Sequence, residues 1–121
     1  MKNDFQLTMD EFLQNIEFER SEKNSNQWIV ENDLICEFEM FVATLANHEM
    51  EDRTLSDFLF LLTGMERIPP FGLEKKIDVK FDPEEDFADI STCALRLNIN
   101  PKDVGGILRN CVLYGGGLGK V

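Results

Sequence analysis

Basic residues are scarce in this sequence, and it contains no long apolar run. Only 12 of the 121 residues are Lys or Arg, against 23 Asp or Glu, so the formal net charge is −11. The acidity lies in the first half, because residues 1–60 carry 4 basic and 14 acidic side chains, a balance of −10. A protein that binds nucleic acid or an anionic membrane surface needs clusters of Lys and Arg. We therefore expect no nucleic acid and no membrane as partners.

Cysteine and histidine are also few. The chain has three cysteines and one histidine, and no Cys-x-x-Cys pair. This pattern argues against a disulfide framework and a zinc site, and it favours a reducing compartment. A membrane span needs a run of about 18 apolar residues, and no stretch of the sequence is close to that length. The N-terminus lacks the apolar core of a signal peptide. We expect a cytoplasmic location, with the nucleus as an alternative, and neither a cofactor nor a metal.

The residues that are abundant predict one α+β domain. The composition is 43% hydrophobic with ten Phe, enough for one core in a chain of this length. Apolar spacing predicts helices at about 9–20, 31–48, 54–63 and 101–112, and alternation predicts strands at 76–81 and 95–99. The acidic loop "DPEEDFAD" joins the two strands. We expect a small β-sheet packed against several helices.

Each predicted helix has a candidate cap. Thr8 with Glu11 three positions later forms the capping-box pattern. The other expected caps are Asn32 or Asp33, Thr54 or Ser56, and Asn100 followed by Pro101. Gly64 is expected to end the third helix. These signals place the helix boundaries independently of the apolar spacing.

Two segments resemble ligand-binding loops only in part. An EF-hand counted from Asp82 would need Gly at its sixth position and Glu at its twelfth, where this chain has Phe87 and Cys93. The stretch "YGGGLGKV" follows no strand, and Lys120 is not followed by Ser or Thr, as a phosphate-binding loop requires. We expect neither calcium nor a nucleotide at these loops.

The three cysteines differ in their surroundings. Cys36 and Cys111 lie among apolar residues and are predicted to be small buried hydrophobes. Cys93 follows Ser91 and Thr92 at a loop-to-strand junction, where backbone N–H groups can face a bound carbonyl. From this pattern alone, Cys93 could be a nucleophile or a small residue of the strand.

Three stretches in fixed order carry a resemblance to a known family: "FLFLLTGMERIPPFGL", "KIDVKF" and "STCALRL". From about Phe38 to the last residue, the chain resembles the C-terminal lobe of HECT-type ubiquitin-protein ligases. In that family a helix ends in Thr-Gly, a Pro-Pro-x-Gly turn and a strand follow, and a catalytic cysteine follows a threonine before another strand. Here these positions are Thr63-Gly64, residues 69–72, residues 77–81 and Thr92-Cys93.

The resemblance implies a ubiquitin-protein transferase. It implies that Cys93 accepts ubiquitin as a thioester from a ubiquitin-conjugating enzyme and passes it to a lysine of a protein substrate. It assigns Thr92 to support of the loop or of the oxyanion. The chain departs from the family at Leu118, where members commonly carry a phenylalanine linked to lysine transfer. It also departs around the cysteine, where "FADIS" and Ala94-Leu95 replace a Leu-Pro pair and an aromatic-Asn pair.

The resemblance also predicts how the chain is divided. Residues 1–33, a helix and a polar loop, correspond by position to the join between two lobes, and residues 34–121 form the lobe-like domain. The conjugating enzyme would be recruited through a larger N-terminal lobe that these residues do not contain. We therefore expect a fragment of a longer ligase, or a truncated relative, that is incomplete as a ligase.

Two non-catalytic alternatives stay open. The first is a module that keeps this fold and binds ubiquitin or another protein. The second is an acidic α+β interaction domain unrelated to ubiquitin.

Overall fold

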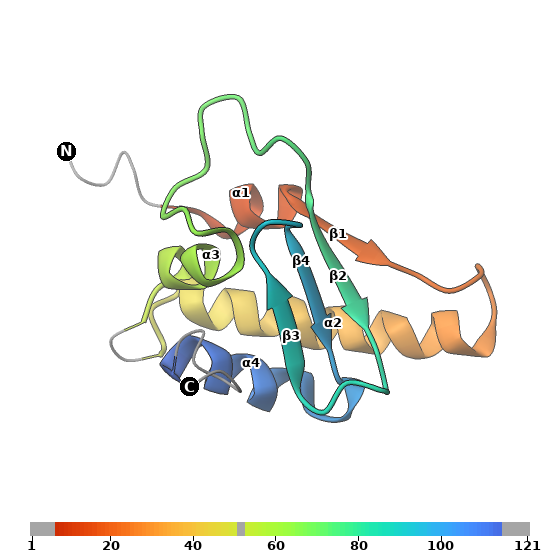
Figure 1. Ribbon diagram of the computed structural model, residues 1–121. Coiled ribbons are helices and arrows are strands. Elements are labelled where there is room, and N and C mark those ends of the chain that lie inside the picture. The colour runs from red at the N-terminus through yellow and green to blue at the C-terminus, as the bar shows by residue number, and fades with distance from the viewer. Residues whose placement is uncertain (1–6, 51–52, 115–121) are drawn as a thin grey trace.

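The computed structural model describes residues 7–50 and 53–114, which form four α-helices and a four-stranded sheet (Figure 1). In chain order the elements are α1 (Met9–Gln14), β1 (Ile16–Glu19), α2 (Asn26–Ala46), α3 (Leu55–Thr63), β2 (Ile77–Phe81), β3 (Ala88–Ser91), β4 (Arg96–Ile99), the short 3-10 helix η2 (Pro101–Asp103) and α4 (Val104–Tyr114). The α+β class predicted from the sequence is confirmed.

The sheet is mixed, with strand order β1-β2-β4-β3. Strands β1, β2 and β4 run parallel, whereas β3 pairs antiparallel with β4 in a hairpin. The side chains of β2 alternate, so that Ile77, Val79 and Phe81 are buried and the residues between them are not. Figure 1 shows α2 and α4 behind the strands, and the buried side chains of β2 belong to the same hydrophobic core as those of these two helices.

Phenylalanine rings form the centre of the core. Phe58 of α3 is fully buried, and its ring lies 5.3 Å from that of Phe12, 5.9 Å from that of Phe38 and 5.4 Å from that of Phe41, measured between centroids. These rings come from α1, α2 and α3. One side chain therefore joins three helices that are far apart in the sequence.

Most of the predicted helix boundaries are confirmed. Thr8 and Thr54 both form capping boxes, and Gly64 ends α3 in the left-handed conformation at φ 80°. The side chain of Asn100 accepts from the backbone N–H of Lys102 at 2.7 Å and caps the short helix η2, so the α-helix predicted from residue 101 begins only at Val104. The cap predicted for α2 is wrong: the helix begins earlier, and Ser25 accepts from the backbone N–H of Trp28.

The predicted helix 9–20 is correct only in its first part. Helix α1 ends at Gln14, and residues 16–19 form β1, which pairs with β2 so that Ile16 lies opposite Ile77. Four residues of weak helical spacing form a strand here because pairing with β2 outweighs their local preference. Strand β3 was not predicted from the sequence, because only four residues of the acidic segment 82–91 pair with β4.

A buried carboxylate fixes the connection from β1 to α2. Glu31 is 5% exposed and accepts from the backbone N–H of Ser21 at 2.9 Å and from its hydroxyl at 2.8 Å. Its carboxylate also lies 3.4 Å from Nε of Arg20, whose guanidinium stacks 4.7 Å above the ring of Trp28. Helix α2 continues without a break through residues 33 and 34. The division of the chain at that point stays a prediction.

Candidate functional site

Cys93 lies on an exposed four-residue turn between β3 and β4. Ser91 and Arg96 form the last pair of the hairpin, and residues 92–95 make the turn. Inside the turn the N–H of Leu95 donates to the carbonyl of Thr92 at 3.3 Å, and Leu95 adopts the left-handed conformation at φ 53°. The thiol is therefore presented to solvent by a short backbone segment that is closed on itself.

The turn is also hydrogen-bonded to β2 and to Lys75, which precedes β2. The N–H of Asp78 donates to the carbonyl of Leu95 at 2.8 Å. Nζ of Lys75 donates to the carbonyl of Ala94 at 3.0 Å and lies 3.2 Å from a carboxylate oxygen of Asp78. These bonds hold the loop of Cys93 against the centre of the sheet, so that the thiol stands at the edge of a rigid element.

Two backbone donors of this turn are available to a ligand. Among residues 7–50 and 53–114, the N–H groups of Thr92 and Cys93 have no hydrogen-bond partner, whereas that of Ala94 donates to the hydroxyl of Ser91 at 3.3 Å. Adjacent N–H groups beside a nucleophile are the donors that stabilise an oxyanion in acyl transfer. Within the described residues, the turn therefore presents two unpaired N–H donors at Thr92 and Cys93.

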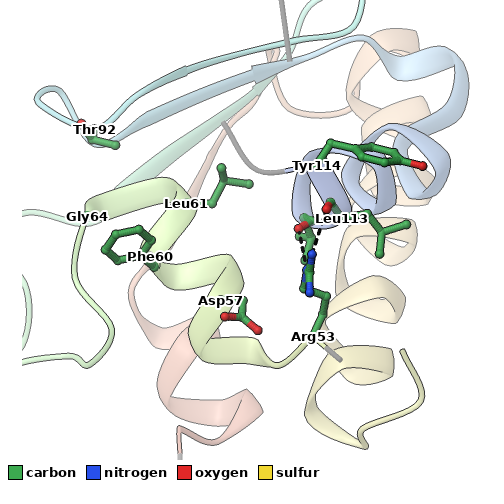
Figure 2. A pocket seen from close by; sticks show the side chains of 9 residues that line it. Arg53, Asp57, Phe60, Leu61, Gly64, Thr92, Leu113 and Tyr114 are labelled. Atoms are coloured by element: carbon green, nitrogen blue, oxygen red, sulfur yellow. Dashed lines mark hydrogen bonds between the residues drawn. The ribbon is translucent and has the colours of Figure 1, made fainter. Parts of the chain in front are cut away.

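A groove of about 690 Å³ extends from Thr92 along α3 to the end of α4 (Figure 2). Its lining residues are Arg53, Asp57, Phe60, Leu61, Gly64, Thr92, Val112, Leu113 and Tyr114. Phe60 is 52% exposed and Tyr114 is 72% exposed. The groove therefore offers apolar surface that the fold itself does not cover, next to the residue that precedes Cys93.

Arg53 forms one wall of this groove and ties it to α4. Its Nε donates to the carbonyl of Val112 at 3.1 Å, and a terminal guanidinium nitrogen donates to that of Leu113 at 2.9 Å. The last carbonyls of a helix lack partners within it and attract positive charge. Arg53 supplies both hydrogen-bond donors and a positive charge to the last carbonyls of α4. These bonds fix this wall of the groove.

The other candidate residues have different outcomes. Cys36 is exposed, so its predicted burial is wrong. It lies two residues from both Leu34 and Phe38, which turns it about 200° away from either at roughly 100° per residue, onto the outer side of α2. The burial predicted for Cys111 is confirmed, at 2% exposure. Leu118 lies outside the described residues.

Burial raises the pKa of the Cys111 thiol from its ordinary value of 9.0 to about 11. In the unfolded chain this thiol ionises at the lower value, so the unfolded state holds fewer protons between these two pH values. The contribution of Cys111 is complete below about pH 9 and is lost as the pH rises towards about 11. We expect the free energy of unfolding to fall less steeply with pH in Cys111→Ala than in the wild type. Urea titrations across this range measure the slopes, and parallel slopes would contradict the prediction.

Two basic residues lie near the turn of Cys93, Arg96 directly after it and Lys75 before β2, and their side chains have different partners. A guanidinium nitrogen of Arg96 lies 3.5 Å from a carboxylate oxygen of Glu19 on β1, so Arg96 is directed across the sheet. The cation that binds the loop is Lys75, which lies 19 positions from Ala94 in the sequence. No local spacing could have indicated this contact, since it depends on β2 lying beside β4.

The structure describes no metal-binding cluster and no membrane span. In residues 7–50 and 53–114, no three side chains among His, Cys, Asp and Glu are grouped as metal ligands. Within the same residues, no helix is both long enough and apolar enough to cross a bilayer.

The fold and the site together define an α+β domain that presents a single cysteine on a rigid, exposed hairpin turn. Comparison with family models adds that residues 2–109 match the family described as HECT-domain (ubiquitin-transferase). The match covers most of the chain, and the chain belongs to this family. The match also includes residues before Phe38, where the resemblance based on motifs begins. Comparison with individual curated proteins finds no significant match.

Proposed function

We propose that Cys93 accepts ubiquitin as a thioester from a ubiquitin-conjugating enzyme and passes it to a lysine of a protein substrate. Membership of the ubiquitin-transferase family supports the type of reaction. The observation that carries the assignment is the turn 92–95, which exposes the thiol beside two unpaired N–H donors. Of the other two cysteines, Cys111 is buried and Cys36 lies on the regular helix α2, where backbone N–H groups are bonded within the helix.

The proposed reaction is two successive acyl transfers. In the first, the Cys93 thiolate attacks the thioester carbonyl of the loaded conjugating enzyme, a new C–S bond forms, and the enzyme's thiolate leaves. In the second, a neutral lysine amine attacks the Cys93 thioester, a C–N bond forms, and the Cys93 thiolate leaves as the amine loses its proton to solvent. The N–H groups of Thr92 and Cys93 would stabilise the oxyanion in both steps.

Two further residues of the proposal have supporting roles. Thr92 lines the groove, and its hydroxyl would help to hold the turn or the oxyanion. Leu118 would supply the apolar contact linked to lysine transfer. Recruitment of the conjugating enzyme would use a larger lobe beyond these 121 residues, joined through residues 1–33, so the isolated chain should react slowly.

The experiment that tests the proposal is incubation of the full chain with a ubiquitin-loaded conjugating enzyme, followed by non-reducing electrophoresis. We expect a ubiquitin adduct that disappears on treatment with a thiol reductant. Peptide mapping should locate the modification at Cys93. Modification at Cys36 would contradict the assignment, and the absence of any adduct would favour a module that binds ubiquitin without catalysis.

The groove beside Thr92 is proposed to hold the carboxyl-terminal segment of ubiquitin, because a thioester requires that end of ubiquitin to lie at Cys93. We expect Phe60→Asp to lower the rate of adduct formation about 10-fold, since it places a charge on apolar surface that must be covered. Phe71→Asp is the matched control, because Phe71 is 88% exposed and lies outside the groove. Equal rates for the two variants would contradict this use of the groove. The rates are measured with limiting conjugating enzyme.

A further inference from the structure

Lys75 precedes β2 and contacts the turn of Cys93 from outside it. Its ammonium donates to the carbonyl of Ala94 at 3.0 Å and is itself held 3.2 Å from a carboxylate oxygen of Asp78. Among the described residues, Lys75 is the basic residue whose side chain is hydrogen-bonded to the turn, residues 92–95. A hydrogen bond from an ionised donor is shorter and stronger than a neutral one.

The hydrogen bond from Lys75 to the Ala94 carbonyl affects the orientation of more than that carbonyl, because each peptide unit is planar. The carbonyl of Ala94 and the N–H of Leu95 belong to the same unit, and that N–H donates to the carbonyl of Thr92 at 3.3 Å. The carbonyl of Thr92 is in turn coplanar with the N–H of Cys93. Lys75 therefore acts through two linked peptide units on the direction of the Cys93 N–H.

The turn needs such outside support. Leu95 has φ 53°, a conformation that is disfavoured for residues with a side chain and that persists when surrounding contacts impose it. Two contacts reach this point from the segment around the start of β2, namely Lys75 to Ala94 and the N–H of Asp78 to the carbonyl of Leu95. The Asp78 contact uses the backbone and survives side-chain substitution, whereas the Lys75 contact does not.

We propose that Lys75 is a positioning residue for acyl transfer at Cys93: by holding the Ala94 carbonyl, it keeps the Cys93 N–H directed at the oxyanion. This role rests on the proposed function of Cys93. It differs from a purely structural role, because it predicts a loss in the chemical step while the fold and the binding of the conjugating enzyme are retained. The positioning role also depends on the charged hydrogen-bond donor of the Lys75 side chain, and not on the length or bulk of that side chain.

The experiment compares Lys75→Met, Lys75→Arg and Lys80→Met in the full chain, with adduct formation followed against the concentration of ubiquitin-loaded conjugating enzyme. We expect Lys75→Met to lower the maximal rate about 10-fold, less than the roughly 10²-fold loss of a direct oxyanion donor. The half-saturating concentration should stay the same, and Lys75→Arg, which keeps a charged donor, should restore most of the rate. Lys80 lies on β2 opposite Asn98 of β4 rather than opposite the turn, so Lys80→Met removes a positive charge away from the turn and should react as the wild type.

A second readout follows the hydrogen bond itself. In Lys75→Met the amide of Leu95 should exchange with solvent faster, while core amides such as that of Val79 keep their protection. A Lys75→Met variant that charges at the wild-type rate, or a Lys75→Arg variant that gives no rescue, would overturn the role of Lys75 alone. A wild-type chain that forms no adduct at Cys93 would overturn the proposed function, and the role of Lys75 with it.

Discussion

Replacing Cys93 with alanine is expected to lower formation of the ubiquitin adduct by at least about 10³-fold, to the background level of the assay. Without the thiol, no thioester can form on the chain. Because Cys93 is exposed on a turn, its loss removes few packing contacts, and the variant should unfold at nearly the same temperature as the wild type. The measurement is the initial rate of adduct formation under non-reducing conditions, together with thermal unfolding of both proteins.

Cys36→Ala is the sharpest control for this result. Both Cys36 and Cys93 are exposed, so accessibility alone would not distinguish them. Cys36 lies on the helix α2, whereas Cys93 lies on a turn with unpaired N–H donors. We expect Cys36→Ala to charge at the wild-type rate, and an adduct that survives Cys93→Ala but disappears in Cys36→Ala would refute the proposed function.

Of the substitutions considered, Phe58→Ala is expected to cause the largest loss in the free energy of unfolding. Phe58 is fully buried and lies within 6 Å, between ring centroids, of Phe12, Phe38 and Phe41. Removing a buried phenylalanine leaves a cavity and costs about 3–5 kcal/mol, out of a total stability of about 5–15 kcal/mol for a domain. Here the cavity would open between α1, α2 and α3. Urea denaturation of the two proteins measures the difference in the free energy of unfolding.

Phe60→Ala provides the matched control on the same helix. Phe60 lies two residues further along α3, and its side chain is 52% exposed at the groove. We expect it to cost less than about 1 kcal/mol, because little apolar surface returns to water and no closed cavity forms. Similar losses for Phe58→Ala and Phe60→Ala would show that Phe58 is not the centre of the core.

Particular residues show how far the sequence could predict the site. The pattern around Cys93 indicated a junction of a loop and a strand, and the structure places the thiol on the turn before β4. Cys36 was assigned to the core from its apolar neighbours, although helical geometry turns it outward. The groove could not be predicted, because its walls come from three separate segments: residues 53–64, Thr92 and the end of α4.

Signals within the sequence predicted the α+β class, the caps at Thr8 and Asn100, Thr54 as one of two candidate caps, and the resemblance that the family match later confirmed. These features depend on residues close together in the chain, where period, capping and turn chemistry act directly. The folded structure was needed to show that residues 16–19 form a strand and that Lys75 binds the turn of Cys93. Both outcomes require the segment at β2 to lie beside a partner distant in sequence, and no local preference specifies such a pairing.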